Sequence, residues 1–189
     1  PAAATTAVTD TIDVTTLSIT GSASVTEGAA GSYTVSLTSP AQTAVTVNLA
    51  YSGTAINGTD FSGVASVTIA AGASSATFNI ATLDDAIDEV AAESFTVTLS
   101  SAAGGNFESL VISGSNNSVT TAITDNDAAP TLAVSSPTVA ESSGFAQFTV
   151  SLSNPSSNAV TFNPVLASGT ATVGTDTGAA LEYFNGTAW

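Results

Sequence analysis

The chain has 189 residues and a formal net charge of −15, because 15 Asp and Glu residues occur without any Lys, Arg or His. Phosphate groups are recognised mainly by Lys and Arg, so this composition argues against nucleic acid and against direct contact with an anionic membrane as partners. Cysteine is also absent, which excludes disulfides, thiolate catalysis and cysteine zinc sites. The chain contains no apolar run of about 18 residues, the length that would predict a membrane-spanning helix.

Two stretches of the chain repeat each other at a spacing of about 115 residues. TLSITGSASVTEGAAGSYTVSLTSP from Thr16 corresponds to TLAVSSPTVAESSGFAQFTVSLSNP from Thr131, and SGTAINGTD corresponds further on to SGTATVGTD. ITDND, at the end of the first copy, resembles VTDTID near the N-terminus. We therefore predict the tail of a preceding repeat or a linker over residues 1–14, a complete domain over 15–127 and a truncated second repeat over 128–189.

Alternation of apolar and polar residues predicts about eight short strands in the complete unit, separated by Gly, Ser and Asn. The predicted strands cover residues 16–20, 32–37, 44–51, 65–70, 76–82, 94–100, 109–113 and 118–124. Short strands without a helical pattern between them indicate an all-β protein of tandem antiparallel β-sandwich domains, immunoglobulin-like in architecture. We expect these alternating residues to face the core: Tyr33, Val35, Leu37, Phe95, Val97 and Leu99.

Five acidic residues are concentrated in one short segment: Asp84, Asp85, Asp88, Glu89 and Glu93. Two carboxylates about 4 Å apart repel each other by about 1 kcal/mol in water and by about 4 kcal/mol at an effective dielectric constant of about 20. A bound cation would offset this repulsion, and calcium accepts carboxylate and carbonyl oxygens in irregular loops. Zinc prefers nitrogen or sulfur, and magnesium usually retains water ligands. The alternative is a solvated acidic loop that keeps the protein soluble.

Further acidic residues stand at the ends of predicted strands: Glu27 in VTEG, Asp60 in NGTDF, and Asp125 with Asp127 in ITDND. With the acidic segment, these motifs resemble Calx-β domains. That family combines an early Glu, a GTA-x-x-G-x-D-[FY] segment, a DD-x-x-x-E-x-x-E-x-F segment and a terminal I-x-D-x-D, and all four occur here in order. The resemblance covers about 110 residues of the first unit and implies a Calx-β-like sandwich.

The resemblance also implies that carboxylates gather as calcium ligands at one end of the sandwich. The implied ligands are Glu27, Asp60, Asp84, Asp85, Glu89, Glu93, Asp125 and Asp127. One residue more than the family spacing separates Glu89 from Phe95, which leaves open which of the neighbouring acids coordinate, Asp88 among them. For Asp125 and Asp127 the alternative is an Asx-type turn that closes the domain.

The second repeat matches the first through Glu141 and SGTATVGTD, but it lacks the later acidic motifs. Glu141 and Asp176 alone could not form a complete site, and Asn185 with Gly186 predicts a two-residue hairpin turn. Strands from another chain, or self-association, could complete this repeat.

The resemblance extends to the extender repeats of large calcium-dependent bacterial adhesins of the RTX type. It implies an extracellular spacer on the bacterial surface, in which calcium stiffens domains and joints and neighbouring repeats of the same chain are the partners. Like charge on every repeat would oppose aggregation. The alternatives are a building block of a surface layer or filament, and a module that binds carbohydrate through calcium.

We do not expect an enzyme. Only carboxylate chemistry is available to this composition, for example a glycosidase pair. Such a pair needs an aromatic-lined cleft, whereas aromatic residues make up 6% of the chain and mostly alternate with polar residues, as core strands do.

Overall fold

The computed structural model describes residues 6–89 and 91–183 of the chain. These residues form strands, turns and irregular segments and no helix, which confirms the all-β prediction. None of the described segments is a helix long and apolar enough to cross a membrane. The chain divides into two compact units, Pro1–Ser157 and Asn158–Trp189, and the first unit contains the complete repeat and the beginning of the second repeat.

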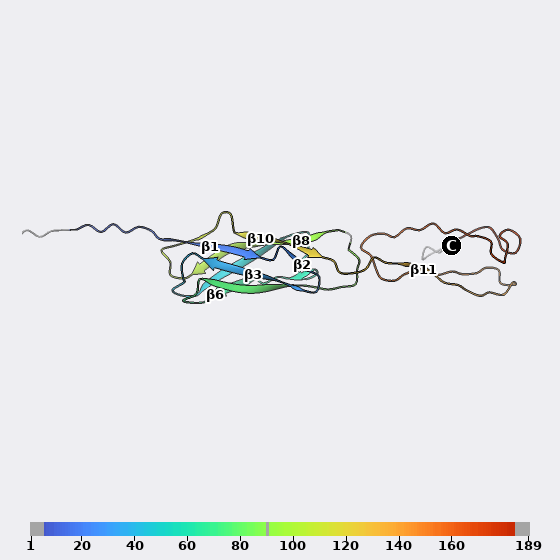
Figure 1. The fold of residues 1–189 in the computed structure, drawn as a ribbon, viewed down its shortest axis with the longest axis horizontal. Helices are drawn as coiled ribbons and strands as arrows, with labels where there is room; N and C mark the ends of the chain where they lie inside the picture. The colour runs from blue at the N-terminus through green and yellow to red at the C-terminus, as the bar shows by residue number, and fades with distance from the viewer. Residues whose placement is uncertain (1–5, 90, 184–189) are drawn as a thin grey trace, which may run out of the picture. The chain divides into compact units, whose positions relative to one another are not determined.

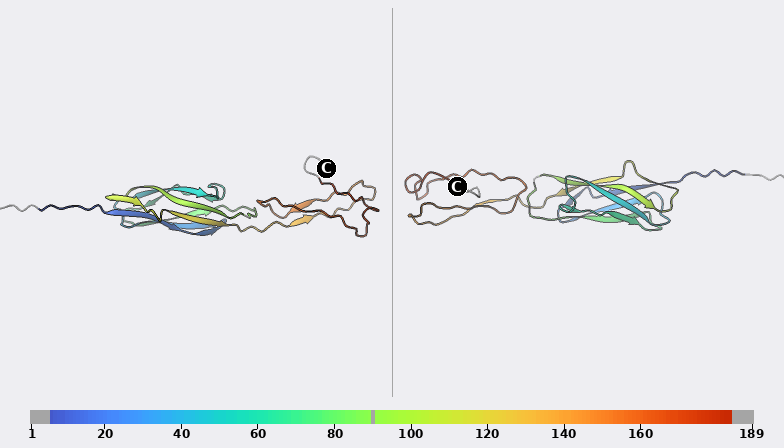
Figure 2. Two further views of the ribbon diagram at one scale, coloured as in Figure 1. Left: turned by 90° about the horizontal axis from the view of Figure 1, so that it is seen from above. Right: turned by 180° about the vertical axis from the view of Figure 1, so that it is seen from behind.

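Two five-stranded sheets pack face to face in the first unit, as predicted for a sandwich (Figure 1; Figure 2). In spatial order the first sheet contains β5 (Phe61–Ser62), β7 (Ser75–Thr82), β3 (Ala30–Leu37), β1 (Val14–Gly21) and β9 (Ser109–Ile112). The second contains β2 (Ser24–Thr26), β10 (Ser118–Thr124), β8 (Glu93–Gly104), β4 (Val45–Gly53) and β6 (Ser66–Ile69). The eight predicted strands are all present. The two extra ones, β2 and β5, are too short to show a period.

Most neighbouring strands are antiparallel, as predicted, but β1–β9 and β2–β10 are parallel pairs. The chain leaves the first sheet at Gly21 and enters the second at Ser24, so β1 and β2 lie in different sheets. A Cβ at Gly21 would overlap the ring of Tyr33, and glycine therefore permits this crossing.

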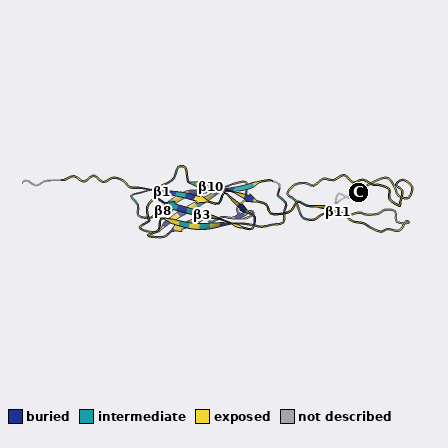
Figure 3. Ribbon diagram, viewed as in Figure 1, coloured by how far each residue is buried: buried dark blue, intermediate teal, exposed yellow. Residues whose placement is uncertain are grey.

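The core lies between the two sheets, and buried positions alternate with exposed ones along the strands (Figure 3). All six residues predicted to face inward are buried. Phe61 stacks on Phe95 with ring centroids 4.4 Å apart. The hydroxyl groups of Tyr33 and Thr121 are 2.6 Å apart, and Thr121 Oγ1 donates to the carbonyl of Ser22 at 2.7 Å.

The second repeat begins with β11 (Leu132–Val134) and β12 (Val150–Leu152), which form an antiparallel pair. Leu132 pairs with Leu152, as Leu17 pairs with Leu37 in the first repeat. Leu132 is nevertheless 46% exposed, whereas Leu17 is fully buried. The predicted turn at 185–186 lies outside the described residues, and the repeat boundaries and strand complementation stay predictions.

Candidate metal centre

The site lies at the end of the sandwich where β2 and β10 finish side by side. Their parallel pairing sets Thr26 opposite Thr124, and the backbone N–H of Glu27 donates to the Thr124 carbonyl at 3.0 Å. Because both strands run in the same direction, the residues that follow them emerge at the same end of the sheet. Acidic residues far apart in the sequence, Glu27 and Asp125, are neighbours for this reason.

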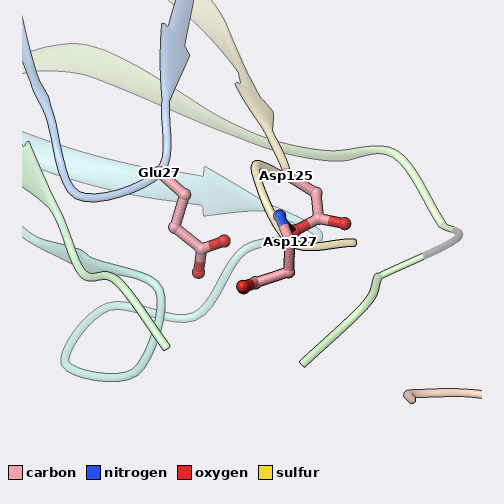
Figure 4. Close-up of side chains that lie close together, drawn as sticks. All are labelled: Glu27, Asp125 and Asp127. Carbon is pink, nitrogen blue, oxygen red and sulfur yellow. Dashed lines mark hydrogen bonds between the residues drawn. The ribbon is translucent and has the colours of Figure 1, made fainter. Parts of the chain in front are cut away.

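Glu27, Asp125 and Asp127 form the most compact carboxylate group in the described part of the chain. One oxygen from each residue lies within 4.8 Å of one oxygen from each of the others. In Figure 4 the carboxyl groups of Glu27 and Asp127 face the same space, and the carboxyl group of Asp125 points to the other side. Glu27 is 8% exposed. Glu27 Oε2 and Asp127 Oδ2 are buried and accept no hydrogen bond.

The acidic loop between β7 and β8 packs against this group. Glu89 donates its backbone N–H to Asp125 Oδ2 at 3.0 Å, and Asp127 donates its own to Asp125 Oδ1 at 3.0 Å. Asp85 Oδ1 accepts the backbone N–H of Ile87 at 2.7 Å, which fixes a turn in the loop. Main-chain donors thus hold Asp125 and Asp85 in place.

A second pair of carboxyl groups, Asp60 and Glu93, stands beside the loop. Asp60 closes the turn before β5, where its Oδ2 accepts the backbone N–H of Ile56 at 2.5 Å. Glu93 is the first residue of β8, and its side chain is hydrogen-bonded to Asp60. Two carboxyl groups can share such a bond when one of them is protonated. The chain has no Lys, Arg or His that could pair with them.

Asn126 is a site residue that the sequence analysis missed. Its Nδ2 donates to the carbonyl of Glu27 and to Asp84 Oδ1, both at 3.2 Å. Asp84 also packs beside Gly28, whose φ is +73°. The side-chain amide therefore ties the acidic loop to the end of β2. In the sequence, the position of Asn126 between the two aspartates of ITDND could have indicated this role.

The electrostatics follow from this crowding. Burial raises the pKa of Glu27 to about 7, and the nearby Asp85, Glu89, Asp125 and Asp127 carboxylates act in the same direction. Burial, followed by neighbouring carboxylates, likewise raises the pKa values of Glu89, Glu93 and Asp127. Without a cation, the repulsion among these carboxylates therefore destabilises the site.

The eight predicted ligands do not form one uniform cluster. Glu27, Asp125 and Asp127 converge; Asp85 and Glu89 face them from the loop. Asp60 joins Glu93, and Asp84 is held by Asn126. In the second repeat, Glu141 is exposed, and Asp176 Oδ2 accepts the backbone N–H of Thr172 at 2.9 Å.

The oxygen spacing fits a calcium ion. Calcium binds oxygen at about 2.3–2.6 Å, so ligands on opposite sides of the ion lie about 4.6–5.2 Å apart. The oxygens of Glu27, Asp125 and Asp127, within 4.8 Å of one another, fall inside that reach. The donor set is all oxygen, which suits calcium and does not suit zinc.

Comparisons with known proteins agree with the fold. The family model of the LapA domain matches residues 13–126, and that of the Calx-beta domain matches residues 125–181. The crystal structure of the apo form of the Calx CBD1 domain matches with a TM-score of 0.50 and 24% sequence identity, over 60% of this chain and 98% of that chain. This likeness confirms a Calx-β-like fold. A search of curated proteins finds no match. The LapA match covers more than half of the 189 residues, and the chain therefore belongs to the LapA domain family.

Proposed function

We propose that the chain is a calcium-binding extender repeat of a bacterial cell-surface adhesin. Calcium would stiffen the domain and its joint to the next repeat, so that a distal binding domain is projected from the cell. The LapA family is related to large adhesins, which supports an adhesin role and an extracellular or surface-associated location. The matched domains are structural, adhesion-type domains and not enzymes.

The observation that carries the proposal is the pair of buried carboxylate oxygens without a hydrogen-bond partner, Glu27 Oε2 and Asp127 Oδ2. For Glu27, which is 8% exposed, a buried oxygen that lacks a partner costs about 1–3 kcal/mol. The chain has no Lys, Arg or His that could provide a partner. A divalent cation between the Glu27 and Asp127 oxygens would remove this penalty.

The proposed primary ligands are Glu27, Asp125 and Asp127, with Asp85 and Glu89 completing the set from the acidic loop. Asp60 and Glu93 would hold a second ion or enlarge the first site, and Asp84 is the most peripheral of the predicted ligands. Bound calcium supplies positive charge that offsets the repulsion among these groups. It would fasten β2, β10 and the acidic loop together at the point where the chain continues into the next repeat.

The position of the site favours a role at a joint. Asp125 and Asp127 follow β10 directly, and only Ala128 and Ala129 separate them from Pro130, next to the start of the second repeat. A calcium ion bound by Asp125 and Asp127 would restrict the conformational freedom of the linker that follows them. Extracellular calcium modules have dissociation constants of about 10⁻⁴ to 10⁻³ M, which suits a site saturated outside the cell.

Thermal unfolding of residues 1–189 in EDTA, in millimolar calcium and in magnesium tests the proposal. We expect calcium, and not magnesium, to raise the melting temperature, since calcium at about ten times the dissociation constant contributes about 1.4 kcal/mol. Glu27→Gln should abolish the rise. Glu141→Gln, which changes the corresponding residue of the second repeat, should leave it intact. Equal melting curves in EDTA and calcium would overturn the calcium function.

A further inference from the structure

Asp88 lies in the acidic loop but makes its contacts with the second repeat. Its backbone N–H donates to the carbonyl of Pro155 at 3.2 Å, and its carbonyl accepts the backbone N–H of Ser157 at 3.1 Å. Asp88 and Ser156 thereby form an isolated parallel β-bridge. The Ser157 hydroxyl donates to the same carbonyl at 3.0 Å, and the Ser156 hydroxyl lies 3.4 Å from Asp88 Oδ2.

The loop around Asp88 is held by one hydrogen bond within the loop and by one to the candidate metal centre. Two residues before Ile87, Asp85 accepts the Ile87 N–H, and immediately after Asp88, Glu89 donates its N–H to Asp125. Asp88 is therefore positioned by the two acidic residues on either side of it. Because Glu89 directly follows Asp88, a movement of Glu89 away from Asp125 would also displace the bridge to Ser156.

A second contact restrains the linker at the same place. Asn154 Nδ2 donates to the carbonyl of Ala128 at 2.6 Å. Residues 154–157 thus contact both the linker and the acidic loop through backbone groups and short polar side chains.

The first repeat shows why this turn can accept a neighbour. Gln42 occupies the position that corresponds to Ser157, and its backbone N–H donates to the carbonyl of Gly105, at the end of β8 in its own sandwich. In the second repeat the acceptor is Asp88 of the preceding domain. The backbone N–H at the position of Gln42 and Ser157 can therefore donate to a carbonyl of its own domain or of the preceding one.

We propose that Asp88 is the docking residue of the joint and that it joins the acidic loop to the turn at residues 155–157 of the following repeat. Calcium on the flanking carboxylates holds this bridge closed, and loss of calcium opens it. The calcium dependence rests on the function proposed above. The partner surface is a turn of the adjacent repeat, and Asp88 contributes its backbone and not an ion-binding carboxylate.

The absence of cysteine from the chain allows a direct test by disulfide trapping. Bridged residues lie about 4.7–4.9 Å apart, as neighbouring strands do, and disulfides accept Cα separations of about 4.4–6.8 Å. Asp88→Cys combined with Ser156→Cys should form a disulfide at least about five times faster in calcium than in EDTA, the lower end of typical coupling between two sites. Thr34→Cys with Thr77→Cys, a pair in register on β3 and β7, should form at the same rate in both.

Two further substitutions, each added to the double-cysteine variant, separate the bridge from general loosening of the loop. Ser157→Pro removes the backbone donor and the hydroxyl, and it should abolish the calcium effect on disulfide trapping between positions 88 and 156. Ser157→Ala keeps the N–H and should retain most of the effect. Ser157 does not belong to the proposed ligand set, so the calcium-dependent rise in melting temperature should persist with both substitutions.

The disulfide between positions 88 and 156 should in turn affect calcium binding. Coupling between two sites is reciprocal at equilibrium, so the disulfide should raise the calcium affinity by the same factor by which calcium raises the equilibrium constant of disulfide formation in a thiol redox buffer. Calcium binding without a calcium effect on trapping would overturn the docking role of Asp88 but leave the proposed calcium site of the domain intact. Failure of the protein to bind calcium at all, measured by titration calorimetry, would overturn both.

Discussion

Asn126 donates its side-chain amide to Asp84, with Nδ2 3.2 Å from Oδ1, and so supplies a positive dipole to an acidic loop in a chain without basic residues. The same amide contacts the carbonyl of Glu27. One neutral side chain therefore connects the two strand ends and the loop that build the proposed site.

Removal of this amide should weaken the site in the presence and in the absence of calcium. We expect Asn126→Ala to lower the free energy of unfolding by about 1.5–3 kcal/mol, because hydrogen bonds to charged groups fall in that range. Urea unfolding in EDTA measures the loss. Asn48→Ala is the matched control, since the Asn48 amide donates to the Ser101 hydroxyl on an exposed strand face. A loss no larger than that of the control would remove Asn126 from the site.

The pH dependence of stability should change sign when calcium is added. The folded-state pKa of Glu27 is about 7 against an ordinary value of 4.5. Between these values the folded protein binds more protons than the unfolded chain, so without calcium stability should fall as pH rises from about 4.5 to about 7. Thermal unfolding in EDTA across this range measures the trend, and Glu27→Gln should flatten it.

With calcium the carboxylates must be deprotonated to bind, so affinity should increase as pH rises through about 7 and binding should release protons. Calorimetry in buffers of different ionisation enthalpy measures the number released. An affinity that is constant from about pH 5.5 to about pH 8 would show that Glu27 is not a ligand.

Gly28 should not tolerate a side chain. Its φ is +73°, and an added Cβ would lie 3.0 Å from the side chain of Asp84. The left-handed conformation alone costs a non-glycine residue about 1–2 kcal/mol. Gly72, with φ +82° and open space around it, is the matched control. Gly28→Ala should therefore lower stability more than Gly72→Ala in urea unfolding, and only Gly28→Ala should also weaken calcium binding.

The buried hydroxyl pair in the core should affect stability without affecting calcium. Thr121→Val leaves the Tyr33 hydroxyl and the Ser22 carbonyl without their partner and should cost about 1–3 kcal/mol. Tyr33→Phe should cost less, because Thr121 can still donate to Ser22. Chemical unfolding of both variants checks the order. A larger loss for Tyr33→Phe would mean that the ring hydroxyl, and not Thr121, is the centre of this network.

The repeated sequence separates local from tertiary effects. In the first repeat Asp60 accepts the N–H of Ile56, and in the second Asp176 accepts the N–H of Thr172, with Gly58 and Gly174 both at positive φ. This turn needs only the residues within it, so the sequence determined its geometry in both copies. The strands and inward-facing residues of the first unit were predictable for the same reason, since their period of two is a property of the backbone.

Two features could not be read from the sequence. The first feature is the pair of parallel contacts, β1 with β9 and β2 with β10, which form because the chain crosses between the sheets after β1 and after β9. The role of Asn126 depends on Asp84, which lies far away in the sequence. Contacts of this kind are set by strand pairing and not by spacing along the chain.

Composition and motif order determined the all-β class, the Calx-β-like architecture and the acidic residues of the proposed site, because these depend on side-chain chemistry and local periodicity. The tertiary structure decided burial. Leu17 and Leu132 occupy equivalent places in equivalent strand pairs, yet only Leu17 is covered, in a sandwich that supplies the opposing strands. Glu27 and the exposed Glu141 differ in the same way. Burial of Glu27 within the fold raises the pKa of its carboxyl group and removes the water that would otherwise solvate its charge.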